Sequence, residues 1–138
     1  GRVIAVDILP IAPISAVRVV QGDFRTSELR EKVLALAAGH VDVVLSDLAP
    51  NVSGIHVVDQ ARSSELVELA VNFSTSVLKG DGVFITKVFH GESYDALIGI
   101  IQARFRRVIV RKPGASRGES RETYLVCRYP VGAPDRKD

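Results

Sequence analysis

Residues 41–51 read Val41-Asp42-Val43-Val44-Leu45-Ser46-Asp47-Leu48-Ala49-Pro50-Asn51, and this stretch decides the fold. An apolar, β-branched run stops at a carboxylate, and a proline turn follows. Such a run is typical of a buried strand in a parallel sheet. Ligands of open α/β sheets bind just beyond the carboxyl ends of the strands. Asp47 is therefore well placed to hold a polar ligand or to orient a reacting group.

Two later apolar runs also carry an ionisable residue near one end. Residues 83–87 end at Lys87, and residues 122–127 begin with Glu122. If these strands neighbour the first one, Asp47, Lys87 and Glu122 share one site. A lysine in a partly dry cleft can have its pKa lowered toward about 7–8 and act as a general base. The alternatives are a surface lysine along the sheet edge and a solvated glutamate at a strand start.

Strands alternate with helices along most of the chain. Strands are expected at 3–6, 17–20, 42–46, 83–88, 108–110 and 122–128, and helices at 26–38, 59–78 and 93–105. Alternation predicts an α/β fold with a mostly parallel sheet covered on both faces, and the last two strands predict an antiparallel pair at one edge. Residues 3–6 read as a buried strand. Gly39 is expected to end the first helix, and residues 79–82 are expected to form a turn.

Length and composition fit one domain with a sizeable core, since the chain has 138 residues of which 46% are apolar. We expect this domain over residues 1–130 and a mobile tail over residues 131–138. No apolar stretch is long enough to span a membrane, and a single cysteine, Cys127, is typical of a reduced, cytosolic protein. Three scattered histidines predict no metal site.

Charge is unevenly distributed, because residues 104–138 hold ten basic and four acidic residues. This asymmetry indicates either an anionic partner or a solvated surface, and charge alone does not separate the two. Within this region Arg111, Lys112, Arg117 and Arg121 belong to a polar loop that is suited to gripping phosphates.

Asp7 and Asp23 each follow an expected strand. A carboxylate at such a position commonly accepts hydrogen bonds from ribose hydroxyls, and one further out can accept from the amino group of a base. Capping of a turn is the alternative for each of them. Together they favour a nucleoside ligand. Tyr94 and Tyr124 have side chains that can stack on a base, although a core position is preferred for Tyr124.

Five segments in this order resemble the FtsJ (RrmJ) family of ribose 2′-O-methyltransferases, and within it the bacterial members that act on large-subunit ribosomal RNA. The resemblance covers nearly the whole chain, and its SDLAPNVSG and KVFHG blocks are long and specific. The segments are residues 5–10 (AVDILP), 21–25 (QGDFR), 46–54 (SDLAPNVSG), 86–91 (TKVFHG) and 111–124 (RKPGASRGESRETY).

The resemblance implies a Rossmann-like fold that uses S-adenosylmethionine to methylate a ribose 2′-hydroxyl of large-subunit ribosomal RNA, at a uridine. By the same resemblance, Lys87 deprotonates or orients the 2′-oxygen, Asp47 lies beside the methionine part of the cofactor, and Glu122 supports the geometry. Asp7 corresponds to the ribose-binding acid and Asp23 to the acid near the adenine amino group. The implied partner is ribosomal RNA or the large subunit, and the implied protein is a cytoplasmic monomer.

The sequence also departs from this family. The family's first strand, its glycine-rich cofactor loop and its first catalytic lysine have no counterpart, and the chain contains no methionine. We expect an internal piece of a longer gene product, with a gap or a re-pairing in the sheet and exposed apolar faces. Such a piece is expected to bind cofactor weakly and to be inactive. A nicotinamide-dependent oxidoreductase and a non-catalytic RNA-binding module remain as alternatives.

Overall fold

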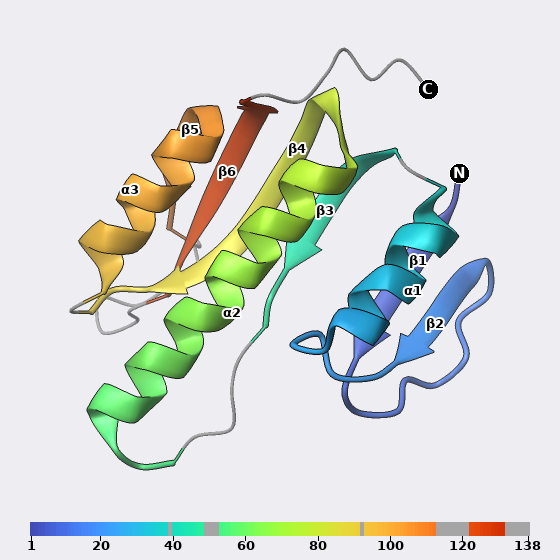
Figure 1. Ribbon diagram of the computed structural model, residues 1–138, viewed down its shortest axis with the longest axis horizontal. Coiled ribbons are helices and arrows are strands. Elements are labelled where there is room, and N and C mark those ends of the chain that lie inside the picture. The colour runs from blue at the N-terminus through green and yellow to red at the C-terminus, as the bar shows by residue number, and fades with distance from the viewer. Residues whose placement is uncertain (39, 49–52, 92, 113–121, 132–138) are drawn as a thin grey trace. The chain divides into compact units, whose positions relative to one another are not determined.

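The computed structural model describes residues 1–38, 40–48, 53–91, 93–112 and 122–131 (Figure 1). The chain divides into two compact units, residues 1–40 and 41–138. The predictions for Gly39 and for the tail from residue 132 onward lie outside the described residues. The single domain expected over residues 1–130 stays a prediction.

The first unit is a pair of parallel strands with one helix. β1 (Val3–Asp7) pairs in parallel with β2 (Val17–Gln21), and α1 (Ser27–Ala37) follows. The predicted burial of the first strand is wrong, because Val3 is 57% exposed and no residue of β1 is fully buried. The physical reason is that β1 has a single partner strand in a two-stranded sheet. The buried apolar residues of this unit are Val20, Leu29, Val33 and Ala37.

The second unit is a four-stranded sheet with two helices. Its elements are β3 (Val41–Ser46), α2 (His56–Val77), β4 (Leu78–Phe89), α3 (Tyr94–Arg104), β5 (Phe105–Arg111) and β6 (Glu122–Pro130). The strand order is β3-β4-β6-β5, with β3 parallel to β4 and the other two pairs antiparallel. The predicted α/β class is therefore confirmed. The mostly parallel sheet with an antiparallel last strand is confirmed for this unit too, because β6 alone runs opposite to β3, β4 and β5.

The turn predicted at residues 79–82 is wrong, because these residues lie within β4. The ladder between β3 and β4 is irregular there, since Val41 pairs with Leu78 and Val43 already pairs with Val83. The extra residues form a bulge, and the ammonium of Lys79 lies 3.0 Å from the carboxylate of Asp42 across it. Two glycines close together in the sequence resemble a turn, but here they belong to a bulged strand.

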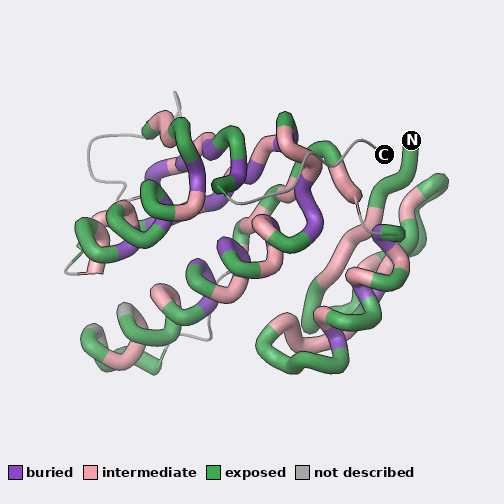
Figure 2. Tube along the Cα trace, turned by 45° about the horizontal axis from the view of Figure 1, so that its top comes forward, coloured by how far each residue is buried: buried purple, intermediate pink, exposed green. Residues whose placement is uncertain are grey.

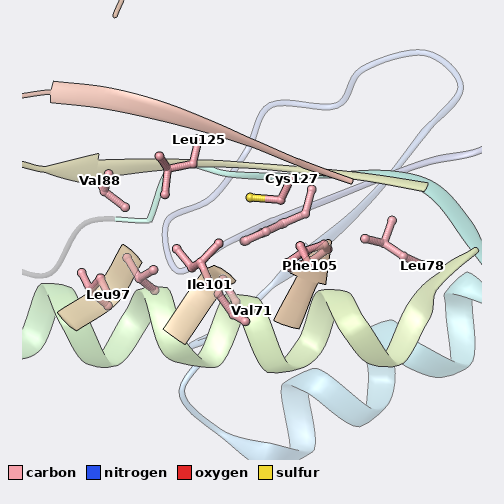
Figure 3. Packing of buried hydrophobic residues seen from close by; sticks show 11 residues of the cluster. Val71, Leu78, Val88, Leu97, Ile101, Phe105, Leu125 and Cys127 are labelled. Atoms are coloured by element: carbon pink, nitrogen blue, oxygen red, sulfur yellow. The ribbon is translucent and has the colours of Figure 1, made fainter. Parts of the chain in front are cut away.

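Helices α2 and α3 contact each other and bury the same face of the sheet (Figure 3). Strand residues of this face include Phe84, Val88, Leu125 and Cys127, all at most 1% exposed. The rings of Phe84 and Phe105 stack with centroids 5.7 Å apart. Burial raises the pKa of the Cys127 thiol to about 12, so this thiol stays neutral at physiological pH. Figure 2 shows buried positions recurring along α2 between exposed ones.

The opposite face of this sheet carries Lys87, and we call it the Lys87 face. Side chains alternate along a strand and paired residues share a face, so this face holds every second residue of each strand. Val43 and Leu45 on β3 are 53% and 73% exposed. The predicted coverage on both faces is therefore wrong for this unit. The members of the Lys87 face are Val43, Leu45, Val83, Ile85, Lys87, Phe89, Glu122, Tyr124, Val126, Arg128, Arg107, Ile109 and Arg111.

Within the described residues, no helix combines the length and the apolar character needed to cross a membrane.

Candidate functional site

The structure brings the three expected site residues together at one end of the Lys87 face. The ammonium of Lys87 lies 2.5 Å from the Asp47 carboxylate and 3.8 Å from the Glu122 carboxylate. The positions follow from the sheet, because β4 lies between β3, which ends just before Asp47, and β6, which starts at Glu122. The neighbouring strands predicted from the sequence are confirmed, and so is the proximity of the three side chains.

Lys87 is not a surface lysine, because only 13% of its side chain is exposed. Its partners are more accessible, at 67% for Asp47 and 41% for Glu122. A cation withdrawn from water beside two carboxylates that reach the solvent can present its remaining N–H groups to a ligand. The arrangement suits a ligand that offers an oxygen as hydrogen-bond acceptor.

The hydrogen bond to Asp47 raises the pKa of Lys87 above its ordinary value, and this outweighs the opposite effect of burial. The lowered pKa considered from the sequence is therefore wrong. Burial alone favours the neutral amine, but a carboxylate in direct contact favours the ammonium more strongly. Lys87 is a fixed positive charge at neutral pH.

The loop after Asp47 is fixed where it enters α2. The Asp59 carboxylate accepts hydrogen bonds from the Ser53 hydroxyl at 2.6 Å, the Ser53 amide at 2.8 Å and the Gly54 amide at 3.3 Å. These hydrogen bonds, led by that of the Ser53 side chain, lower the pKa of Asp59. Gly54 has a φ of 85°, which glycine adopts at little cost. Asp59 was not predicted as a site residue. An acidic residue in the first turn of a helix often accepts hydrogen bonds from nearby amides, and this feature was visible in the sequence.

Phe89 also lies beside Lys87, although it was not predicted as a site residue. Its ring centroid lies 5.3 Å from the ammonium of Lys87, and Glu122 is its cross-strand partner. Phe89 follows Lys87 by two residues, so strand alternation places both side chains on the same face of the sheet. This spacing was visible in the sequence. The core position preferred for Tyr124 is wrong, because Tyr124 is the cross-strand partner of Lys87 and is half-buried outside the core cluster.

Tyr94 packs against the core instead of standing free. Its ring stacks on the imidazole of His90 with centroids 4.1 Å apart, and both contacts hold the start of α3. Tyr94 thus has a packing role in this structure, whereas the sequence left open whether it stacks on a base.

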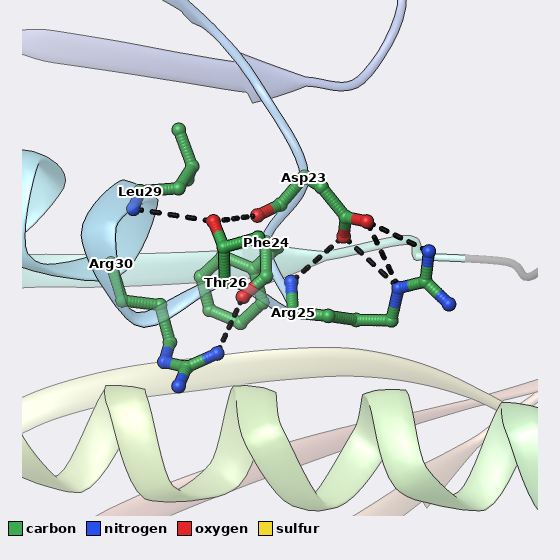
Figure 4. A network of polar contacts seen from close by, with 6 residues as sticks. All are labelled: Asp23, Phe24, Arg25, Thr26, Leu29 and Arg30. Atoms are coloured by element: carbon green, nitrogen blue, oxygen red, sulfur yellow. Dashed lines mark hydrogen bonds and ion pairs between the residues drawn. The ribbon is translucent and has the colours of Figure 1, made fainter.

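Asp7 and Asp23 both cap turns in the first unit. The Asp7 carboxylate accepts a hydrogen bond from the Leu9 amide at 3.0 Å. Asp23 is held by Arg25 through a guanidinium contact of 2.7 Å and a backbone hydrogen bond of 2.9 Å (Figure 4). The Arg25 side chain is the main reason why the pKa of Asp23 is lowered. Thr26 is the N-cap of α1, and its hydroxyl oxygen accepts a hydrogen bond from the Leu29 amide.

The turn-capping contacts leave a possible ligand role for both acids, because each carboxylate oxygen can accept more than one hydrogen bond. Asp7 is exposed, and the side chain of Asp23 is 29% exposed. The two acids follow neighbouring parallel strands, so they lie at the same edge of their sheet.

The expected phosphate-binding loop is described only at its start. Arg111 ends β5 on the Lys87 face, and Lys112 follows it; both are exposed. Arg117 and Arg121 lie outside the described residues. Arg107 and Arg128, which were not predicted as site residues, are also exposed on the Lys87 face and are cross-strand partners. Among the described residues, no group of three histidine, cysteine or acidic side chains is arranged to hold a metal ion.

A model of the family described as FtsJ-like methyltransferase matches residues 1–129 of the chain. The chain is 49% identical over 129 residues to a "Ribosomal RNA large subunit methyltransferase E" of Marinobacter nauticus, covering 93% of this chain and 62% of that protein. It is 51% identical over 127 residues to the protein of the same name from Variovorax paradoxus, covering 91% and 57%. The chain thus spans about three fifths of the length of these curated relatives.

Solved structures show the same fold. A crystal structure of a ribosomal RNA methyltransferase from Plasmodium falciparum matches with a TM-score of 0.80 and 26% identity, covering 95% of this chain and 73% of that one. Human methyltransferase-like protein 13 in complex with SAH matches with a TM-score of 0.64 at 18% identity, covering 93% and 61%. At that identity the second match supports the fold alone.

Proposed function

Because the chain belongs to the FtsJ-like methyltransferase family, we propose that it carries the catalytic part of an enzyme that methylates a ribose 2′-hydroxyl in large-subunit ribosomal RNA. The finer elements of the proposal are S-adenosylmethionine as methyl donor, a uridine as the modified nucleotide, and a cytoplasmic monomer as the working form. The contact of Lys87 with Asp47 and Glu122 is the observation that carries the proposal.

Lys87 acts in this proposal as an ammonium that orients the ribose. Its raised pKa keeps it protonated, so it donates a hydrogen bond to the 2′-oxygen and does not remove the proton. One of the two carboxylates, Asp47 or Glu122, receives the hydroxyl proton as the new bond forms. Both carboxylates are solvent-accessible beside the ammonium, so the proton can pass on to water. Much of the acceleration then comes from positioning the attacking oxygen.

When bound, S-adenosylmethionine would supply an electrophilic methyl group for the 2′-oxygen, and the electron pair of its carbon–sulfur bond would stay on sulfur. The residues that would hold it fit its chemistry, because Asp7 and Asp23 offer carboxylate oxygens at one edge of the β1–β2 sheet. Asp7 would accept from the ribose hydroxyls and Asp23 from the adenine amino group. Asp47 would lie beside the methionine part.

The exposed arginines of the Lys87 face support a polyanionic substrate. Arg107 and Arg128 face each other across β5 and β6, and Arg111 lies further along the same face. Like charges directly opposite each other on a sheet are destabilising unless a counter-charge lies near them. An RNA phosphate would supply that charge, and binding would then weaken as salt rises.

The test is the transfer of tritiated methyl from S-adenosylmethionine to large-subunit RNA, using the longest form of the protein that its gene encodes. Lys87→Ala should lower the transfer rate about 100-fold or more, because the 2′-oxygen loses its orienting donor. Binding of S-adenosylmethionine, measured by calorimetry, should be nearly unchanged. Lys79→Ala is the matched control, since Lys79 lies on the same strand and also pairs with an aspartate.

Two outcomes would contradict the proposal in different ways. A wild-type rate in the Lys87→Ala variant would remove this residue from the mechanism. Salt-dependent RNA binding without any methyl transfer by the wild-type protein would favour the non-catalytic RNA-binding module. The position and base of the modified nucleotide are then read by mass spectrometry of the digested RNA, which tests the uridine separately.

A further inference from the structure

Phe89 presents an aromatic ring to solvent beside the three charged site residues. It is the last residue of β4, is 37% exposed and lies outside the core cluster. Its ring centroid is 5.3 Å from the ammonium of Lys87, and its cross-strand partner is Glu122. The ring, the ammonium and the carboxylate therefore occupy one small area of the Lys87 face.

The core does not account for this exposure. The chain buries Phe84 and Phe105 completely in the same unit, while Phe89 stays accessible at the end of its strand. A phenyl ring on a residue that is 37% exposed forgoes part of the free energy that complete burial would give. A partial cation–π contact with an ammonium that already has a carboxylate partner recovers little of it. A flat apolar ligand that covers the ring would recover more.

We propose that the Phe89 ring stacks on the base of the nucleotide whose 2′-hydroxyl is methylated. The inference rests on the proposed function and adds a base-binding position to it. Unstacked bases of RNA commonly stack on aromatic side chains. The ribose oxygen that contacts Lys87 would lie about 3 Å from its nitrogen. The base on the same sugar is then within reach of a ring 5.3 Å from that nitrogen.

Stacking is tolerant of base identity, because every base has an aromatic face. Phe89 therefore positions the nucleotide without selecting which base it carries. The expected consequence is a role in substrate affinity and in the transfer rate, with little discrimination between a uridine and a cytidine at the modified position.

The experiment combines a change in the protein with a change in the RNA. Two short RNAs contain the mapped target nucleotide, one intact and one with an abasic ribose that keeps the 2′-hydroxyl. Affinity is measured by fluorescence anisotropy, and transfer by single-turnover kinetics. Loss of one base–aromatic stack should weaken binding by wild-type protein about 5- to 150-fold. Phe89→Leu should lose a similar factor on intact RNA and lose nothing further on abasic RNA.

Controls separate stacking from a merely structural role. Phe89→Tyr keeps an aromatic face and should retain affinity within about two-fold. Ile100→Ala is the matched control, because Ile100 is also 37% exposed but lies on α3. Far-ultraviolet circular dichroism reports whether each variant folds. If Phe89→Leu does not fold, the comparison of the two RNAs on wild-type protein still decides the question.

Three results would overturn the inference. They are an equal affinity of wild-type protein for intact and abasic RNA, an unchanged affinity of Phe89→Leu for intact RNA, and an equal loss by Phe89→Leu on both RNAs. The last of these would mean that the ring acts on Lys87 alone. If the wild-type protein binds the RNA but transfers no methyl group, the proposed function is contradicted. The anisotropy measurements would still show whether Phe89 stacks on the base.

Discussion

Asp47 and Glu122 stabilise the protonated, positively charged form of Lys87. Its hydrogen bond to Asp47, together with the charges of Asp47 and Glu122, raises its pKa above the ordinary value of 10.5. Since the folded-state value exceeds the unfolded one, the stabilisation by this pair is complete below pH 10.5. It is lost as pH rises through the folded-state pKa.

The titration of Lys87 can be followed directly. With ¹³C-labelled lysine side chains, the Lys87 signal is assigned by its loss in Lys87→Arg, and its midpoint should lie above 10.5 because the carboxylates favour the ammonium. Lys79, which pairs with a more exposed aspartate, serves as the internal comparison. A titration midpoint of Lys87 between pH 7 and 8 would support its role as a general base and contradict the mechanism in which it acts as an ammonium.

Single residues also show why the site was only partly predictable. Strand ends in the sequence located Asp47, Lys87 and Glu122. The parallel strands β3 and β4 end at the same edge of the sheet, and the antiparallel strand β6 begins there. The direction of the Lys87 pKa was not predictable, since it depends on a contact distance that no spacing reveals. Phe89 was missed because both faces of residues 83–89 are largely apolar, so the run reads as wholly buried.

The bulge in β4 is the feature at the scale of elements that invites a test. A Cβ atom added to Gly82 would lie 2.8 Å from a Leu78 methyl, 3.0 Å from the Lys79 carbonyl oxygen and 3.2 Å from the Asp42 carbonyl oxygen. Two of these atoms are backbone, and Leu78 is fully buried. Gly82→Ala should therefore lower the free energy of unfolding by about 1–3 kcal/mol, as overpacking does.

Gly80 is the matched control for this prediction. It lies in the same bulge, and nothing stands within 4 Å of an added Cβ. Gly80→Ala should be neutral or stabilising by up to about 1 kcal/mol through the unfolded state. Urea denaturation of both variants measures the difference. Equal destabilisation would show that the bulge relaxes around any side chain.

Element boundaries were predicted less well than element types. All nine helices and strands expected from the sequence occur among the described residues. β4 begins at Leu78 instead of residue 83, because tertiary pairing with β3 extends a segment whose glycines suggest a turn. Helix α2 begins at His56 instead of residue 59, beside the Asp59 hydrogen bonds that local sequence did not reveal.

At the scale of the whole chain, the two units differ in how much apolar surface they bury. The buried apolar residues of the first unit are Val20, Leu29, Val33 and Ala37. The second unit has a continuous core under α2 and α3, and its central strand β4 has a partner on each side. Strand alternation alone suggested burial on both sides of this sheet, whereas the exposed Val43 and Leu45 fit the exposed apolar faces expected for a piece of a longer sheet.

Hydrogen exchange should reflect this difference. Amides of the β4–β6 ladder are expected to exchange at least ten-fold more slowly than those of the β1–β2 ladder, because opening the larger core costs more free energy. Exchange measured by nuclear magnetic resonance gives both rates in one sample. Equal protection of the two ladders would show that the units open together as one cooperative structure.

The bulge in β4 also separates two kinds of length change. A residue inserted at positions 79–82 can be absorbed where the ladder is already irregular, and pairing downstream is preserved. A residue inserted between Val83 and Lys87 would reverse the alternation, turning the ammonium toward the helices and a core side chain toward solvent. The number of residues between Val83 and Lys87 therefore decides whether the ammonium of Lys87 points toward Asp47 and Glu122 or into the core.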